Sequence, residues 1–142
     1  MVFGMKSEKG FTLIELIVII VIIGVILVFT LPNITSVLER NKKEQMIADA
    51  KDMVDKAKNK MIKTADYPTG PTGSGCKPFK LKEIDEREEI KTSPYGNSYD
   101  RTSSTVLICL ESEQYKYRIT LKDGSHKIVN VELGQLSIDK VN

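Results

Sequence analysis

One uncharged stretch near the N-terminus constrains this chain more than any other feature. Residues 16–38 carry no charged side chain, and residues 10–32 are mostly aliphatic or aromatic. A helix that rises 1.5 Å per residue over such a run crosses a bilayer core of about 30 Å. Glu15 lies at the start of this helix, and an ionised side chain at mid-membrane costs roughly 3 kcal/mol unless it finds a partner. The run therefore predicts a membrane helix with one candidate functional acid.

The remainder of the chain is small and polar. The 142 residues have a formal net charge of +2, which suits one domain beyond the membrane segment and does not favour nucleic acid as a partner. Two cysteines indicate one disulfide in an oxidising compartment, or two free thiols in the cytosol.

The first ten residues read as a short polar leader that ends at Gly10, and either Met1 or Met5 could start it. A secretory signal peptide places its small-residue cleavage site after the apolar stretch, whereas Gly10 comes before it. The ordinary signal peptide therefore fits poorly, and a simple uncleaved anchor is the alternative.

Residues 9–15 read KGFTLIE, which resembles the processing motif of type IV prepilins and pseudopilins. The resemblance implies that prepilin peptidase cuts after Gly10 and methylates the new amine of Phe11. It also implies that Glu15 is the family's acid used in assembly. Gly24 and Pro32 fall where such pilins often have a helix-weakening glycine and proline.

Cleavage after Gly10 would create a free amine one helical turn from Glu15. The amine and carboxylate can partly neutralise each other within one subunit. Between staggered subunits, Glu15 could instead pair with a neighbour's amine, because opposite charges attract strongly at low dielectric. An unpaired Glu15 would then disfavour a filament in which neighbouring subunits are assembled in the wrong register. The simpler alternative is an anchor whose acid lies near the lipid headgroups.

Gly24 and Pro32 weaken a helix, since glycine costs about 1 kcal/mol in a helix interior and proline removes a backbone bond. We expect this segment to be helical in the bilayer and partly unwound in a filament. A mild kink without a role is the alternative.

Apolar residues recur at helical spacing after residue 33, which predicts one helix of about 54 residues, or ~80 Å. Residues 11–32 form its membrane and assembly part, and residues 33–66 form its amphipathic half, with Met46, Met53 and Met61 as core residues. Asp66 and Pro68 should end it. Residues 67–103 are expected to be a loop region, including one short helix over 81–90.

Residues 104–142 are predicted to form an antiparallel sheet and a tail, with strands at 105–110, 115–121 and 127–133. In the last strand we expect Val129, Val131 and Leu133 to point inward. Together with the long helix, this predicts an α+β fold, the pilin fold, in which the helix packs on a small sheet. Residues 93–99, SPYGNSY, resemble the turn that precedes the sheet in several pilins and major pseudopilins.

A bridge between Cys76 and Cys109 is the economical reading if the domain lies outside the cytoplasm, and it would contribute roughly 3–4 kcal/mol. His126 is interpreted as a solvated edge residue. The sequence holds no nucleophile motif, metal-ligand spacing or phosphate loop, so we expect no enzyme activity, cofactor or metal.

Three functions fit these patterns. The leading one is a structural subunit of a type IV pilus-like filament; the second is a pseudopilin of a competence or type II secretion system; the third is an anchored extracytoplasmic domain that does not polymerise. The first two imply as partners prepilin peptidase, identical or related subunits, inner-membrane assembly machinery and the membrane. They also imply a single-pass membrane protein with an extracytoplasmic C-terminal domain that enters an extracellular pilus or an envelope filament.

Overall fold

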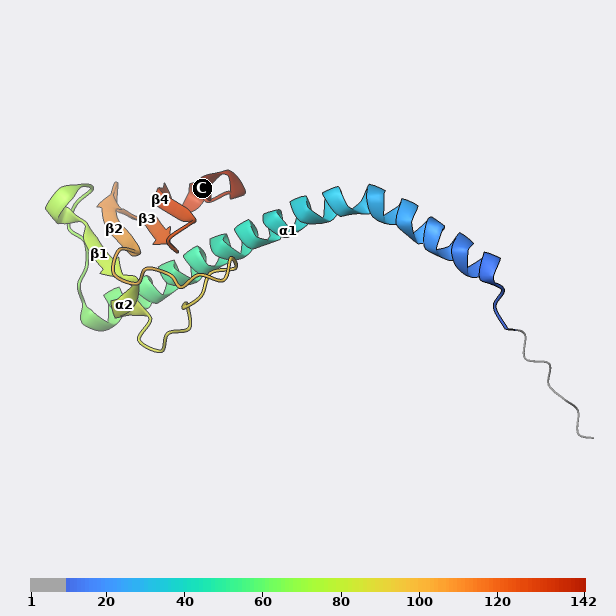
Figure 1. The fold of residues 1–142 in the computed structure, drawn as a ribbon. Coiled ribbons are helices and arrows are strands. Elements are labelled where there is room, and N and C mark those ends of the chain that lie inside the picture. Colours follow the sequence, from blue (N-terminus) through green and yellow to red (C-terminus); the bar gives the residue numbers. More distant parts are fainter. Residues whose placement is uncertain (1–9) are drawn as a thin grey trace, which may run out of the picture. The chain divides into compact units, whose positions relative to one another are not determined.

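The computed structural model describes residues 10–142, without the side chains of residues 31–33, so the leader over residues 1–9 lies outside the described residues. The chain divides into two compact units, Met1–Leu38 and Glu39–Asn142. The elements, shown in Figure 1, are α1 (Leu13–Thr64), β1 (Lys77–Lys80), α2 (Leu81–Ile84), β2 (Thr105–Glu111), β3 (Gln114–Lys122) and β4 (Lys127–Glu132), with short 3-10 helices at Gly73–Gly75, Leu133–Gln135 and Ile138–Lys140.

Helix α1 is continuous over 52 residues and includes Gly24 and the backbone of Pro32. Its C-terminus is closed by Ala65, which adopts a left-handed φ of 52°. The Asp66 amide then donates to the Met61 carbonyl at 3.2 Å, which satisfies a carbonyl that the helix can no longer use. The expectation of one long helix that ends before Asp66 is confirmed. Unwinding near Gly24 and Pro32 concerns a filament and stays a prediction.

The sheet has four antiparallel strands in the order β1-β2-β3-β4, so the α+β class is confirmed. The three expected strands are present, but the prediction of a loop through residues 77–80 was wrong. Lys77 to Lys80 pair with Ile108 to Thr105 as an edge strand. Pro78 lies exposed within it, and proline is tolerated in a strand only at such an edge, which explains why the sequence resembled a loop.

The core lies between the inner face of the sheet and the part of α1 that follows Glu39. Figure 1 shows the strands side by side along this part of the helix. The three methionines contribute as predicted, since Met46, Met53 and Met61 are at most 3% exposed. The buried residues that they meet from the sheet are Val106, Ile108, Ile119, Leu121 and Ile128.

The inward set of β4 was predicted correctly at Val131 and wrongly at Val129. Ile128 and Val131 are buried, whereas Val129 is 50% exposed. Asn130 has a left-handed φ of 51°, and the pairing with β3 shifts register between Ile119 and Leu121. The Asn130 amide donates to the Thr120 hydroxyl at 3.1 Å. This bulge inserts a residue and reverses the alternation that the sequence implied.

Helix α2 is a single turn instead of the expected helix over 81–90. The next residue, Asp85, has a fully buried carboxylate that accepts hydrogen bonds from the amides of Glu89 (3.1 Å) and Ile90 (2.9 Å). Arg101 and Lys56 lie 3.1 and 3.4 Å from the same carboxylate. Burial alone would raise the pKa of Asp85, but these donors together lower it below its ordinary value. A loop folded around Asp85 therefore replaces the predicted helix.

Candidate assembly site

The first turn of α1 is built around Thr12 and Glu15. The Glu15 amide donates to the Thr12 hydroxyl at 3.3 Å, and the Thr12 amide donates to the Glu15 carboxylate at 3.5 Å. This reciprocal pair is a capping box, which satisfies two backbone donors that the start of a helix leaves free. The pattern of threonine followed by glutamate three residues later was present in the sequence. The local role of Glu15 could therefore have been predicted there, but it was missed.

The capping box also fixes where the Glu15 charge lies. The carboxylate folds back to the Thr12 amide, immediately beside Phe11. A negative charge is favoured at this end of a helix by the helix dipole. The carboxylate is thus held next to the position where cleavage after Gly10 would expose a positively charged amine.

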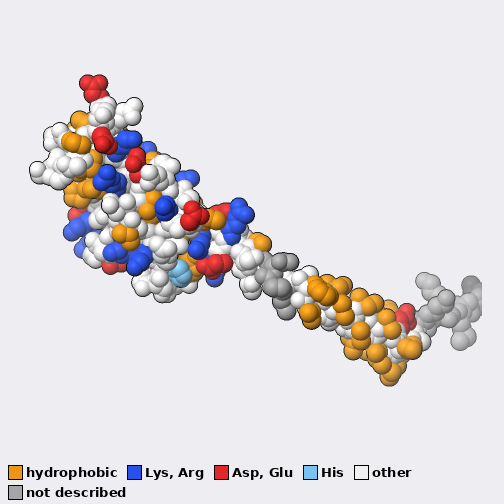
Figure 2. Space-filling model, turned by 90° about the horizontal axis from the view of Figure 1, so that it is seen from above, with side chains coloured by type: hydrophobic (Ala, Val, Ile, Leu, Met, Phe, Trp, Pro, Cys, Tyr) orange, Lys and Arg blue, Asp and Glu red, His pale blue; other side chains and the backbone are white. Residues whose placement is uncertain are grey.

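The surface that follows Glu15 is apolar and uncovered. None of the window Leu13–Thr30 is buried, although it is long and apolar enough to span a membrane. Phe11 is 76% exposed and Phe29 is 74% exposed. Figure 2 shows hydrophobic side chains massed along this segment. An apolar surface of this extent is stable only when lipid or another protein covers it.

Two glycines at the site are not required by the structure of the single chain. A side chain at Gly10 or Gly24 would meet no atom within 4 Å. Gly24 stands inside α1, where glycine costs about 1 kcal/mol relative to alanine. Nothing in the described part of the chain therefore requires glycine at either position. The side chain of Pro32 is outside the described residues.

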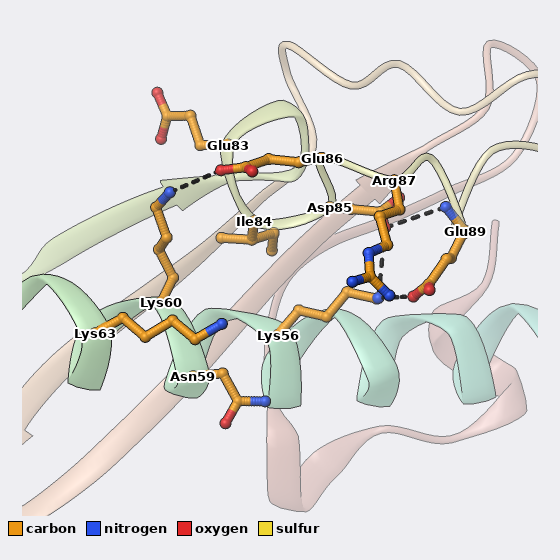
Figure 3. Close-up of a pocket in the computed structure, with 10 residues that line it drawn as sticks. All are labelled: Lys56, Asn59, Lys60, Lys63, Glu83, Ile84, Asp85, Glu86, Arg87 and Glu89. Atoms are coloured by element: carbon orange, nitrogen blue, oxygen red, sulfur yellow. Dashed lines mark hydrogen bonds and ion pairs between the residues drawn. The ribbon is translucent and has the colours of Figure 1, made fainter.

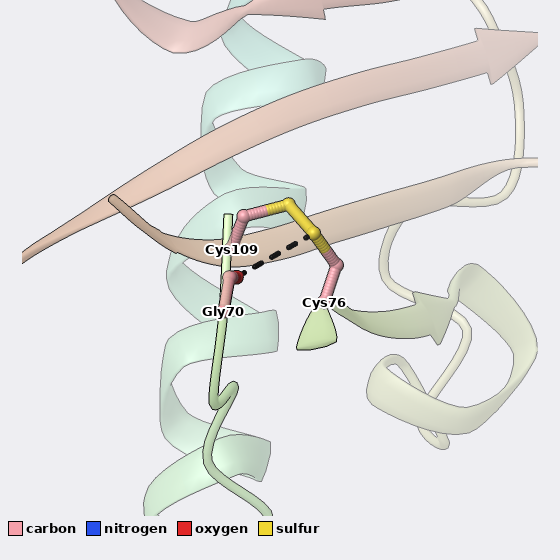
Figure 4. Close-up of a disulfide and its surroundings, with 3 residues drawn as sticks. All are labelled: Gly70, Cys76 and Cys109. Atoms are coloured by element: carbon pink, nitrogen blue, oxygen red, sulfur yellow. Dashed lines mark hydrogen bonds between the residues drawn. A yellow bond between two sulfur atoms is a disulfide. The ribbon is translucent and has the colours of Figure 1, made fainter. Parts of the chain in front are cut away.

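The disulfide joins Cys76, just before β1, to Cys109 in β2. Figure 4 shows Gly70 beside it, with its carbonyl oxygen 3.8 Å from the Cys76 sulfur. The loop before the bridge closes on itself, since the amides of Thr69 and Gly70 both donate to Gly75. A side chain at Gly75 would lie 2.7 Å from the Gly70 backbone, so glycine is needed there. The bridge and this turn fix the edge of the sheet.

A charged groove lies between α1 and the segment that follows α2, as Figure 3 shows. Lys60 pairs with Glu86 at 3.0 Å, and Lys56 pairs with Glu89 as well as with Asp85. These pairs tie the loop around Asp85 to the helix, which is a structural role. Within residues 10–142, no group of three His, Cys, Asp or Glu side chains could hold a metal ion.

The segment at residues 93–99 is fixed to α1 by its two tyrosines. The Tyr95 hydroxyl donates to Glu39 at 3.0 Å, and the Tyr99 hydroxyl donates to Asp49 at 2.6 Å. Burial and the Glu39 hydrogen bond raise the pKa of Tyr95 to about 12. His126 stacks on the Tyr95 ring with centroids 3.5 Å apart and is half-buried, so the interpretation as a solvated edge residue was wrong.

Known proteins share the N-terminal site. The family "Prokaryotic N-terminal methylation motif" matches residues 5–31, which include Gly10, Phe11 and Glu15. This motif, the apolar helix and the four-stranded antiparallel sheet together define the class: the chain carries a prepilin-type N-terminal motif on an α+β fold that is consistent with the pilin fold.

Two relatives extend the similarity beyond the motif. The chain is 24% identical over 107 residues to type II secretion system core protein G of Vibrio cholerae, covering 70% of this chain and 73% of that protein. It is 30% identical over 71 residues to the protein of the same name from Dickeya chrysanthemi, covering 50% of this chain and 46% of that protein. No solved structure matches. The chain is thus a pilus-like subunit with pseudopilin relatives.

Proposed function

We propose that the chain is processed after Gly10, methylated at Phe11 and assembled into a filament through residues 11–38. The observation that carries this proposal is the apolar surface of Leu13–Thr30, none of which is buried. Lipid covers such a surface before assembly, and neighbouring helices cover it in a filament.

Glu15 supplies the register in this proposal. Moving an apolar helix from lipid to a helix bundle gains little hydrophobic free energy, because lipid tails are as apolar as side chains. A pair between Glu15 and a neighbour's Phe11 amine is directional, and any stagger that leaves the carboxylate unpaired is penalised. The capping box supports this role, since it already holds the carboxylate beside Phe11.

The second candidate is a pseudopilin in a secretion or competence filament. The names of both relatives favour a type II secretion apparatus over a surface pilus. The N-terminal chemistry is the same in both candidates, and they differ in the length and location of the filament. The partners implied are prepilin peptidase, related subunits and an inner-membrane assembly machinery.

We further infer a structural role without catalysis and a domain outside the cytoplasm. The bond between Cys76 and Cys109 supports an oxidising compartment. In the groove beside α1, Lys56 and Lys60 are occupied by acidic partners, which supports a structural function for that groove.

Substitution of Glu15 tests the assembly step. We expect Glu15→Gln to leave the processed chain in the membrane and to reduce sheared or extracted filament at least tenfold, because the register pair is lost. Filament would be quantified by immunoblot against total processed chain. Glu44→Gln is the matched control, since Glu44 is an exposed acid of α1 that pairs only with Arg40 at 2.9 Å among the described residues. Equal filament yield in both variants would contradict the role of Glu15. Absence of filament even from the wild-type chain would favour a non-polymerising anchored domain.

A further inference from the structure

The face of the sheet turned away from α1 gathers positive charge. In β3, Ile119 and Leu121 are buried in the core. Successive side chains of a strand point to opposite faces, so Lys116, Arg118 and Lys122 lie on the outer face. All three are partly accessible to solvent.

Neighbouring strands extend this row. Lys127 of β4 is paired with Lys122, and paired residues share a face of the sheet. Lys80 of β1 is paired with Thr105, which is in turn paired with Thr120 of β3. We call these five cations the basic sheet face: Lys80, Lys116, Arg118, Lys122 and Lys127.

Few acids balance the basic sheet face. Glu132 and Glu111 share the outer side, and Glu132 is 3.2 Å from Lys116 in the one ion pair that the five cations make among the described residues. Asp100 lies at the rim beyond the face, where the Thr102 and Ser103 hydroxyls donate to its charged carboxylate. Five cations against Glu111 and Glu132 leave +3 on this face of a chain whose total is +2. The charge is therefore concentrated by the fold, and the count for the whole chain conceals it.

The chemistry of this face favours a polyanion over a protein partner. The cores of protein interfaces are depleted in lysine and enriched in aromatic residues. Here the cations surround Thr105, Leu107 and Thr120, and the β3 tyrosines, Tyr115 and Tyr117, alternate to the opposite side. Without aromatic rings the face also lacks the stacking platform that single-stranded nucleic acid uses.

We propose that the basic sheet face binds the phosphate backbone of double-stranded DNA without sequence preference. Alternate residues of β3 are spaced about 6.8 Å apart and neighbouring strands about 4.8 Å, which sets several cations against a duplex that carries one charge per 1.7 Å of axis. When three to four phosphates are neutralised, the logarithm of the binding constant falls with the logarithm of the salt concentration with a slope of about −3 to −4. The non-specific dissociation constants are then about 10⁻⁴ to 10⁻⁶ M.

The test uses the full chain in phosphatidylcholine nanodiscs and a short fluorescent DNA duplex, with anisotropy measured between about 50 and 200 mM salt. We expect the combined variant Lys116→Gln, Arg118→Gln and Lys122→Gln to lose at least tenfold in affinity at the lowest salt and to flatten the slope by about 2 to 3. The matched control, Lys51→Gln, Lys63→Gln and Arg87→Gln, removes equal charge from exposed positions outside the sheet. It should keep the wild-type slope to within about 1. Circular dichroism and thiol alkylation verify that both variants are folded with the disulfide intact.

Several outcomes would overturn the proposal. They are absence of duplex binding by the wild type at the lowest salt, equal losses in the two variants, and tighter binding of single-stranded DNA. If phosphatidylglycerol vesicles displaced the labelled duplex at a lipid phosphate concentration below the phosphate concentration of the DNA, the face would be assigned to anionic lipid instead. Self-association that only the sheet variant loses would assign it to a second copy of the chain. The dispersed chain is used, so the result does not depend on whether filaments form.

Discussion

At the scale of single residues, the proposed assembly step depends on one acid, Glu15, and the stability of the domain depends on another, Asp85. Glu15 is exposed beside the start of α1, where its capping box directs a charge toward Phe11. Asp85 is buried and holds a loop together through two backbone amides and two cations. Sequence reasoning found Glu15 because it is an acid at the start of an uncharged apolar run and falls within the motif at residues 9–15. It missed Asp85 because Lys56 and Arg101 meet it only after folding.

Gly10 provides a direct test of processing. We expect Gly10→Leu to block cleavage, so that mass spectrometry finds the precursor mass in the membrane. The structure gives Gly10 no role in folding, since a side chain there meets nothing within 4 Å, and the loss must arise from the peptidase step. Gly134→Ala is the control at another open position, and it should be processed normally. A mature chain beginning at Phe11 in the Gly10→Leu variant would contradict this account.

Asp85 provides a test of the electrostatics. Its folded pKa is lowered, so its contribution to stability is present above the unfolded pKa of about 3.9 and is lost as pH falls through the folded value. We expect Asp85→Asn to lower the free energy of unfolding by about 3 kcal/mol near neutral pH, since it leaves Arg101 and Lys56 without their buried partner. The difference from wild type should shrink below about pH 4. Urea unfolding in detergent measures both, and an undiminished difference in acid would refute the assignment to ionised Asp85. Asp55→Asn, at an exposed pair with Lys58, should have little effect.

At the scale of elements, the periodicity of apolar residues along the sequence predicted the elements that have regular geometry. The uncharged run and the apolar stripe located α1, and β-branched and aromatic residues located β2, β3 and β4. Strand β1 was not predicted because Pro78 and the lysines around it are typical of a loop. These residues form a strand only through their pairing with β2. The full set of inward residues in β4 was not predicted because the bulge depends on contact between Asn130 and Thr120 of another strand. The basic sheet face was not predicted for the same reason, because the register between strands brings its cations together.

The bulge makes a prediction of its own. Asn130→Val should destabilise the domain by about 1–2 kcal/mol, because a β-branched residue disfavours the φ of 51° found there. Asn130→Gly should be close to neutral, since glycine accepts that backbone conformation without strain. Thermal unfolding of the two variants compares them directly. If valine were tolerated as well as glycine, β4 would have to follow the regular alternation that the sequence first implied.

At the scale of the whole molecule, the chain combines a helical segment that must be covered by others with a domain that covers its own core. Residues 13–30 are buried nowhere in the chain, whereas the stripe from Met46 to Met61 is buried against the sheet. The N-terminal motif is the prepilin-type one, and the relatives are pseudopilins of a secretion system. The central claim is that the chain becomes an assembly subunit only after its leader is removed.

Intact mass and N-terminal sequencing of the native protein, from membranes and from sheared surface material, test that claim most directly. The account predicts a chain that begins with N-methylated Phe11 in the membrane. The same chain in the sheared fraction would indicate a surface pilus, and its confinement to the envelope would indicate a pseudopilin. A native protein that still begins at Met1 or Met5 would contradict the claim and leave a membrane-anchored domain that does not assemble.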